Sequence, residues 1–296
     1  MWECEYREPV DLRATLGMLG RGPYDPTTQW DARGLWRTFR TPEGVATARI
    51  TQQPRGAVSV QAWGPGAEWV IAGAPRLLGA EDDWSGLDVS AHPVLRETKR
   101  RNPALRLMTT RRVFEALAPA IIEQKVTSIE AYRSWARLLR RFGEPAPGPG
   151  PAMLRVAPSP EVWRRIPSWE WHRAGVDPRR SRTVVEAARV AESLERSEKD
   201  DGSRRLRTVP GIGVWTAAET IQRSHGAPDE VSFGDYHLAH YVGTVLTGSR
   251  VDDDGMRELL EPWTGQRQRV VRLVLASGHP MERHGPRAPV RDHRSR

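Results

Sequence analysis

The chain has 296 residues and a formal net charge of +8 at neutral pH. All but three of its 45 basic residues are arginines, which suit phosphate, so nucleic acid is a candidate partner and an ordinary solvated surface is the alternative. The single cysteine, Cys4, excludes a disulfide framework, a zinc site made of cysteines and a four-cysteine iron–sulfur cluster. No apolar run reaches the ~18 residues of a membrane span, and the first residues lack a signal-peptide core. We therefore expect a cytoplasmic protein.

Residues 6–79 favour strands. The stretches "VATARI" (45–50) and "AVSVQAW" (57–63) alternate apolar and polar side chains with the period of a half-buried strand, and "EWVIAG" (68–73) adds a short apolar run. Gly-Pro pairs between such segments are typical of turns. The pattern predicts a small α+β domain, residues 1–80, built on an antiparallel sheet.

From about residue 82 the apolar spacing becomes helical. The stretch "RRVFEALAPAIIEQKVT" (111–127) places apolar residues four positions apart, and Pro119 within it predicts a kink or a division of the helix. Ser128 is the expected N-cap of the following helix, and Gly143 is its expected end.

Residues 143–160 are too rich in proline and glycine for a helix or a strand, and they predict a loop. Asp177 and Pro178 then open another helix, with proline at its first position. Several short helices follow, so we expect a helical domain over residues 81–280. The polar, arginine-rich residues 281–296 predict a disordered basic tail.

The stretch "VPGIGVWTA" (209–217) places Gly211 and Gly213 just before a helix that begins near Val214. Glycines let another molecule approach the main chain closely, and a helix N-terminus presents unpaired N–H groups and a partial positive charge. Together these features favour a phosphate-binding site. An ordinary tight connection between two helices is the alternative.

Asp235 lies 22 residues after Gly213 and opens the stretch "DYHLAHYVGTVLTG". The combination of "LRTVPGIGVWTAAETI" with "FGDYHLAHYV" resembles the helix-hairpin-helix DNA glycosylases, in particular the bacterial 3-methyladenine DNA glycosylase II branch. The stretches "FEALAPAIIEQKVT", "AGVDPRRSRTVVEAARVAESL" and "EPWTGQRQRVVRLVLASG" are similar to further helices of that branch. The resemblance implies a TBP-like N-terminal domain followed by an all-α, two-lobed glycosylase domain.

In this family the hairpin backbone holds the phosphodiester beside a nucleotide that is flipped out of the duplex. The resemblance assigns that role to the amides of Gly211, Gly213 and Thr216. It also implies a monovalent cation, Na⁺ or K⁺, at the hairpin carbonyls of Val209 and Ile212. We expect no other cofactor and no iron–sulfur cluster.

Asp235 matches the catalytic aspartate of the family. A fixed carboxylate opposes the positive charge that develops on the sugar when the N-glycosidic bond breaks, and it can orient or deprotonate water. The alternative role is a helix N-cap, and the two roles are compatible. Trp215 stands where strand-cutting members carry a lysine, so we expect no lyase activity. Trp215 lines the base pocket in this interpretation, and a place in the core is its alternative.

Gln124 and Lys125 match the segment whose side chain fills the gap left by the flipped base, although the close branch favours an apolar wedge there. A solvated helix position is the alternative for Lys125. Glu219 replaces a pocket tyrosine of the close branch, and "RLVLASG" (272–278) lacks the aromatic residue that would complete such a pocket. These differences bear on the substrate more than on the reaction.

The leading hypothesis is a monofunctional DNA glycosylase of base excision repair. It would flip an alkylated purine such as 3-methyladenine from double-stranded DNA, hydrolyse its N-glycosidic bond and leave an abasic site, acting as a monomer. One alternative keeps this fold and chemistry but changes the substrate to an oxidised, deaminated or bulkier base. The other is a DNA-binding module without catalysis.

Overall fold

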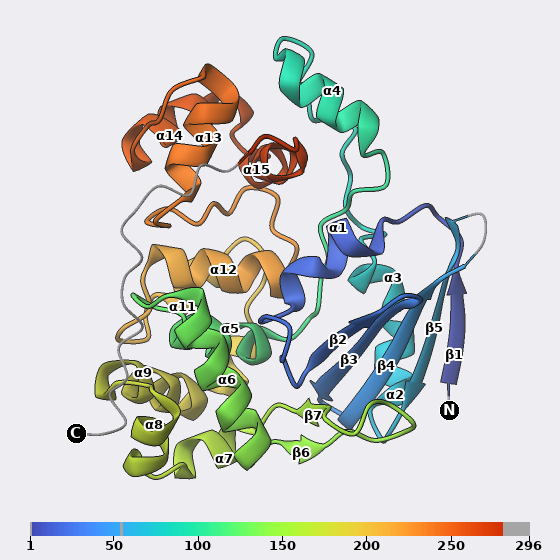
Figure 1. Cartoon of the computed structure of the whole chain (residues 1–296), viewed down its shortest axis with the longest axis vertical. Coiled ribbons are helices and arrows are strands. Elements are labelled where there is room, and N and C mark those ends of the chain that lie inside the picture. The colour runs from blue at the N-terminus through green and yellow to red at the C-terminus, as the bar shows by residue number, and fades with distance from the viewer. Residues whose placement is uncertain (1, 54–55, 281–296) are drawn as a thin grey trace.

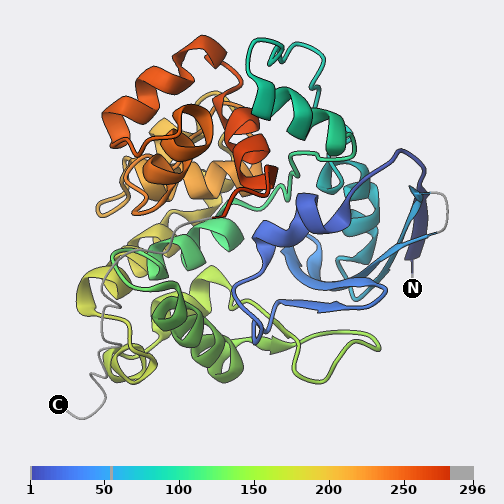
Figure 2. The same ribbon diagram turned by 45° about the horizontal axis from the view of Figure 1, so that its top comes forward.

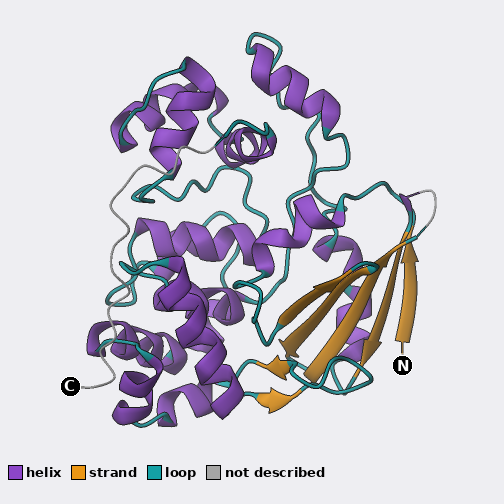
Figure 3. Cartoon of the chain, in the orientation of Figure 1, coloured by secondary structure: helices purple, strands orange, loops and turns teal. Residues whose placement is uncertain are grey.

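A computed structural model describes residues 2–53 and 56–280 of the chain. A five-stranded antiparallel sheet lies at one side of the molecule and helices make up most of the remainder, as Figure 3 shows. The predicted mixture of helices with an antiparallel sheet is therefore confirmed. The predicted tail, residues 281–296, lies outside the described residues.

The sheet has the strand order β1-β5-β4-β3-β2, with every neighbouring pair antiparallel. Its side chains alternate between buried and partly buried along β5, as expected for a sheet that is covered on one face. The predicted strand at 45–50 falls within β4, and the one at 57–63 begins one residue before β5. The strands are β1 (Trp2–Tyr6), β2 (Thr28–Asp31), β3 (Gly34–Thr41), β4 (Gly44–Gln52) and β5 (Val58–Trp63).

The strand expected at 68–73 is wrong, because this segment forms helix α2 (Ala67–Ala72). Ala67 and Val70 are buried three positions apart, the spacing of a helix face, and α2 packs against the sheet. A short continuous apolar run fits either a buried strand or a buried helix. Helix α3 (Ala74–Leu77) follows, and α1 (Leu12–Leu16) lies between β1 and β2.

Of the kink or division predicted at Pro119, the division does not occur, because helix α5 (Val113–Ile122) runs through this proline, and the helix ends before residue 127. The next helix, α6 (Ser128–Phe142), is capped by Thr127 and not by Ser128. The Thr127 side chain accepts from the N–H of Glu130, whose carboxylate accepts from the N–H of Thr127. This reciprocal capping box moves the cap by one residue. Gly143 ends α6 as predicted.

The loop expected at 143–160 contains two short antiparallel strands, β6 (Glu144–Pro145) and β7 (Arg155–Val156). Asp177 caps the helix that begins at Pro178, as predicted. The remaining helices are α4 (Pro93–Arg101), α7 (Pro160–Arg165), α8 (Ser168–Ala174), α9 (Pro178–Arg189), α10 (Ala191–Glu195), α11 (Gly202–Leu206), α12 (Val214–Ser224), α13 (Leu238–Thr247), α14 (Asp253–Leu260) and α15 (Arg267–Ala276).

Buried apolar side chains gather in separate clusters. One lies between the sheet and α1–α3, a second holds α5–α12 together, and a third joins α4 to α13–α15. The third cluster therefore unites residues from the early and the late helical sequence. Figures 1 and 2 show α13–α15 and α4 on one side of α12, and α6–α9 on the other.

No helix in the described part of the chain combines the length and apolar character needed to cross a membrane.

Candidate active site

The predicted hairpin joins α11 to α12, and its glycines are exposed. Gly211 has a φ of +93°, which a side chain disfavours, whereas Gly213 has an ordinary φ of −98° and caps α12. Among the described residues, the backbone N–H groups of Gly211, Gly213 and Thr216 donate no hydrogen bond. The exposed glycines Gly211 and Gly213 thus present two free amides at the positive end of a helix of 11 residues, and the free amide of Thr216 lies in a buried residue beside them.

The carbonyls predicted to hold a cation differ in their bonding. The carbonyl of Val209 accepts from the N–H of Ile212 at 3.1 Å, while that of Ile212 accepts no hydrogen bond from a described residue. A carbonyl oxygen has two lone pairs, so both can still ligate a cation. Two carbonyls supply only part of an alkali ion's ligands, and water or a DNA phosphate would have to complete them.

Gln124 and Lys125 lie in the turn between α5 and α6, next to the hairpin in space. The Gln124 amide donates to the carbonyl of Gly211 at 3.0 Å and to the Thr216 hydroxyl at 2.8 Å. Lys125 is exposed and has a φ of +53°, a strained value for a residue other than glycine. The turn therefore holds the Lys125 side chain in solvent beside the hairpin.

Asp235 precedes α13 and is fixed by three hydrogen bonds. Its Oδ1 accepts from the backbone N–H groups of His237 at 2.9 Å and Leu238 at 3.1 Å, which satisfies the start of the helix. Its Oδ2 accepts from the indole N–H of Trp215 at 3.1 Å. The N-cap residue of α13 is His237 and not Asp235, but the Asp235 carboxylate bonds to the start of α13 and also contacts the first turn of α12.

Trp215 is half-buried and lies outside the three core clusters described above. This favours the pocket interpretation over the core alternative. The neighbouring Tyr236 was not singled out from the sequence, although 75% of its surface is exposed. Its position directly after Asp235 was the sequence feature that could have marked this aromatic residue as part of the site.

Glu219, four residues after Trp215 on α12, takes part in a buried polar network. One carboxylate oxygen accepts from the Ser232 hydroxyl at 2.5 Å and the other from the Arg223 guanidinium at 2.7 Å. These partners hold the pKa of Glu219 below its usual range despite burial, which acts in the opposite direction. Glu219 is therefore an anchored hydrogen-bond acceptor.

A second ion pair, between Arg21 and Glu123, joins this network from other segments. Arg21 Nε and Glu123 Oε1 are 3.1 Å apart, and both side chains are largely buried. Burial raises the pKa of Glu123, and Arg21 opposes that effect. Sequence analysis did not identify this pair, because its members lie far apart in the chain.

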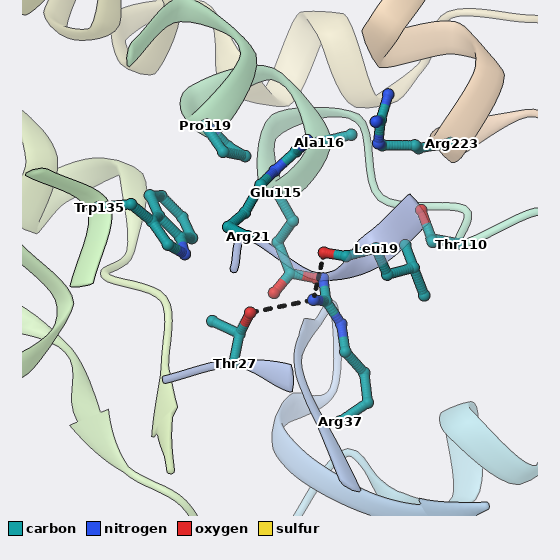
Figure 4. A pocket seen from close by; sticks show the side chains of 10 residues that line it. All are labelled: Leu19, Arg21, Thr27, Arg37, Thr110, Glu115, Ala116, Pro119, Trp135 and Arg223. Atoms are coloured by element: carbon teal, nitrogen blue, oxygen red, sulfur yellow. Dashed lines mark hydrogen bonds between the residues drawn. The ribbon is translucent and has the colours of Figure 1, made fainter. Parts of the chain in front are cut away.

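Two cavities lie near these elements, but Asp235 and Trp215 line neither. The smaller, of about 10 Å³, has room for about one water molecule. In Figure 4 the guanidinium of Arg37 bonds to Thr27 and to Leu19 there. The larger, of about 580 Å³, lies between α5, α7, α10 and the end of β3. Neither is therefore the predicted base pocket.

The comparisons with known proteins agree in the fold. No protein-family model matches the chain. A curated DNA-3-methyladenine glycosylase from Bacillus subtilis is 24% identical over 181 residues. The alignment covers 58% of this chain and 59% of the relative, so less than two thirds of the relative's length is matched.

Solved structures match over nearly the whole chain. A 3-methyladenine DNA-glycosylase from Archaeoglobus fulgidus superposes with a TM-score of 0.74 at 18% identity, covering 94% of this chain and 98% of that one. The 8-oxoguanine glycosylase/lyase of Clostridium acetobutylicum, in its apo form, gives 0.68 at 11% identity, with 90% and 93% covered. At such identities the likeness concerns the fold alone. The chain therefore shares its overall fold with these two DNA glycosylase structures.

Proposed function

We propose that the chain is a monofunctional DNA glycosylase of base excision repair, of the 3-methyladenine DNA glycosylase II type. It flips an alkylated purine such as 3-methyladenine from duplex DNA and hydrolyses the N-glycosidic bond, leaving an abasic site. The observation that carries the proposal is the Asp235 carboxylate, fixed by Trp215 next to a hairpin with free amides. The enzyme acts as a cytoplasmic monomer, with a TBP-like domain (1–80) before a two-lobed helical domain (81–280).

The hairpin binds the DNA backbone. The amides of Gly211, Gly213 and Thr216 bind one backbone phosphate, and the dipole of α12 adds a favourable interaction with its charge. Because Trp215 lies in the first turn of α12 and bonds to Asp235, the sugar attached to that phosphate is brought near the carboxylate. The N-terminal end of α12 thus both binds the phosphate and positions the sugar beside Asp235.

Asp235 supplies the electrostatic part of the reaction. The breaking glycosidic bond leaves positive charge on the deoxyribose, and a carboxylate already held in place stabilises it without reorganisation. The same carboxylate can orient the attacking water or accept its proton. The indole of Trp215 holds Asp235 and offers a face on which an electron-poor base can stack.

A monovalent cation at the carbonyls of Val209 and Ile212 is part of the proposal. Both oxygens keep a lone pair for it. When bound, the ion would add positive charge beside the phosphate.

Base release from methylated duplex DNA tests the reaction. We expect free 3-methyladenine and strand breaks that appear only after alkali, because Trp215 lacks the amine needed for a Schiff base. Trapping with borohydride should give no covalent protein–DNA adduct. An adduct would contradict the monofunctional assignment, and Lys125, which lies beside the hairpin, would then be the residue to replace. Salt-sensitive DNA binding without release of any lesion would favour a binding module.

Lys125 is proposed as the wedge that fills the gap left by the flipped base. Replacing it by glycine should lower single-turnover base release about tenfold, because the gap is no longer filled. The free energy of unfolding should not fall, since glycine relieves the positive φ. Lys125→Asn, which tolerates the same backbone but is shorter, should lose activity to the same extent. Unchanged rates in both variants would show that Lys125 is merely a solvated residue.

A further inference from the structure

Two buried ion pairs lie together on one side of α12. Arg223 pairs with Glu219 at 2.7 Å, and Arg21 pairs with Glu123 at 3.1 Å. In both pairs the carboxylate is the more exposed partner: the Glu side chains are 15% exposed, against 8% for Arg223 and 6% for Arg21. All four side chains are thus largely buried, and the two carboxylates are slightly more exposed than the arginines. We call Glu123 and Glu219 the acceptor pair.

The acceptor pair retains capacity for hydrogen bonds. A carboxylate offers about four lone-pair positions, and Glu219 uses its oxygens for Ser232 and Arg223. Glu123 Oε1 is buried and accepts no hydrogen bond from the described residues, although Arg21 is within ion-pair distance. Buried acceptors in folded proteins normally have a hydrogen-bond partner. A donor supplied by a ligand would satisfy Glu123 Oε1, and the Glu219 oxygens keep lone-pair positions for a further donor.

The acceptor pair adjoins the proposed reaction site on two sides. Glu219 follows Trp215 by one helical turn, so the two side chains project from the same face of α12. Ser232, which donates to Glu219, accepts through its carbonyl from the N–H of Asp235 at 3.2 Å. Glu123 immediately precedes Gln124, whose amide bonds to the hairpin. The acceptor pair therefore lies close to the indole on which we propose that the base stacks.

We infer that the acceptor pair reads the flipped base through its N–H donors. The enzyme then prefers purines whose edge carries an amino group or a ring N–H, such as methylated adenine and guanine, over lesions that lack a donor, such as 1,N6-ethenoadenine. Because Arg21 and Arg223 balance the negative charge, hydrogen bonding and not net charge gives the preference. A site with buried acceptors rejects a base that leaves them unpaired. This inference rests on the proposed function.

The test compares two lesions in the full-length protein. Single-turnover rates are measured on duplexes carrying one 7-methylguanine or one 1,N6-ethenoadenine. We expect wild type to favour 7-methylguanine, and Glu219→Gln, which exchanges one acceptor for an amide donor, to lower the ratio of the two rates about tenfold or more. Ser232→Ala leaves the Glu219 charge in place but loosens its position, so it should lower the same ratio by a smaller factor.

Asp82→Asn is the matched control. Asp82 forms a buried ion pair with Arg269 and accepts from the N–H of Leu107, and it makes no hydrogen bond or ion pair with the acceptor pair among the described residues. It should lower the melting temperature and leave the ratio of rates unchanged, because a purely structural loss affects both lesions equally. A ratio that stays at the wild-type value in Glu219→Gln and Ser232→Ala overturns the inference while the proposed function stands. Failure of wild type to release 7-methylguanine or 3-methyladenine overturns the proposed function itself.

Discussion

Asp235→Asn should lower the single-turnover rate of base release by about a thousandfold or more, while affinity for duplex DNA stays nearly unchanged. Asparagine keeps the shape of the side chain, and its carbonyl oxygen can still accept from the N–H groups of His237 and Leu238. The negative charge that opposes the developing sugar cation is lost, and so is the ability to accept a proton. Rates on methylated DNA and fluorescence anisotropy at one fixed salt concentration measure the two effects separately.

Asp253→Asn is the control for the fold of this loop. Asp253 accepts from the N–H of Gly234, directly before Asp235, at 2.8 Å. Its replacement perturbs the same loop without changing the charge at the proposed reaction site, so base release should fall by no more than about threefold. If Asp235→Asn retains a tenth of the activity, or if both variants lose it equally, the carboxylate has a structural role only.

Short-range patterns in the sequence predicted where several helices begin and where one strand lies. The Gly-Ile-Gly stretch indicated where α12 begins, and Asp177 with Pro178 marked the start of α9, because capping depends on residues a few positions apart. The alternation of β5 likewise identified a strand. Ser128 was predicted as the N-cap of α6, but the capping box with Glu130 places the cap at Thr127.

Contacts between distant segments could not be predicted in the same way. Nothing near Glu123 in the sequence indicates that Arg21 will pair with it, because the contact exists only once the N-terminal segment packs on α5 and α6. The position of Lys125 beside the hairpin has the same origin: Gln124 bonds to Gly211 across 87 residues. The resemblance indicated the role of Asp235, whereas its bond to Trp215 required the structure.

The second large effect concerns Gly211, where alanine should lower the free energy of unfolding by about 2–4 kcal/mol. Its φ of +93° disfavours any side chain, and a Cβ there would overlap the side chain of Thr183. Thr183 cannot easily yield, because it is buried in α9 and its hydroxyl donates to the carbonyl of Arg179 at 3.0 Å. Denaturant unfolding measures the loss, and adding Thr183→Ala should restore part of it by removing the overlap.

Gly213→Ala separates binding from stability in the same hairpin. Gly213 has a negative φ, and no atom lies within 4 Å of a Cβ built there, so the free energy of unfolding should change by less than about 0.5 kcal/mol. The methyl group would nevertheless project from the exposed surface where we propose that the phosphate binds, so DNA affinity should fall about tenfold. Unchanged affinity in Gly213→Ala would mean that the phosphate does not approach this amide. The hairpin would then be an ordinary connection between α11 and α12, and its free N–H groups would not bind phosphate.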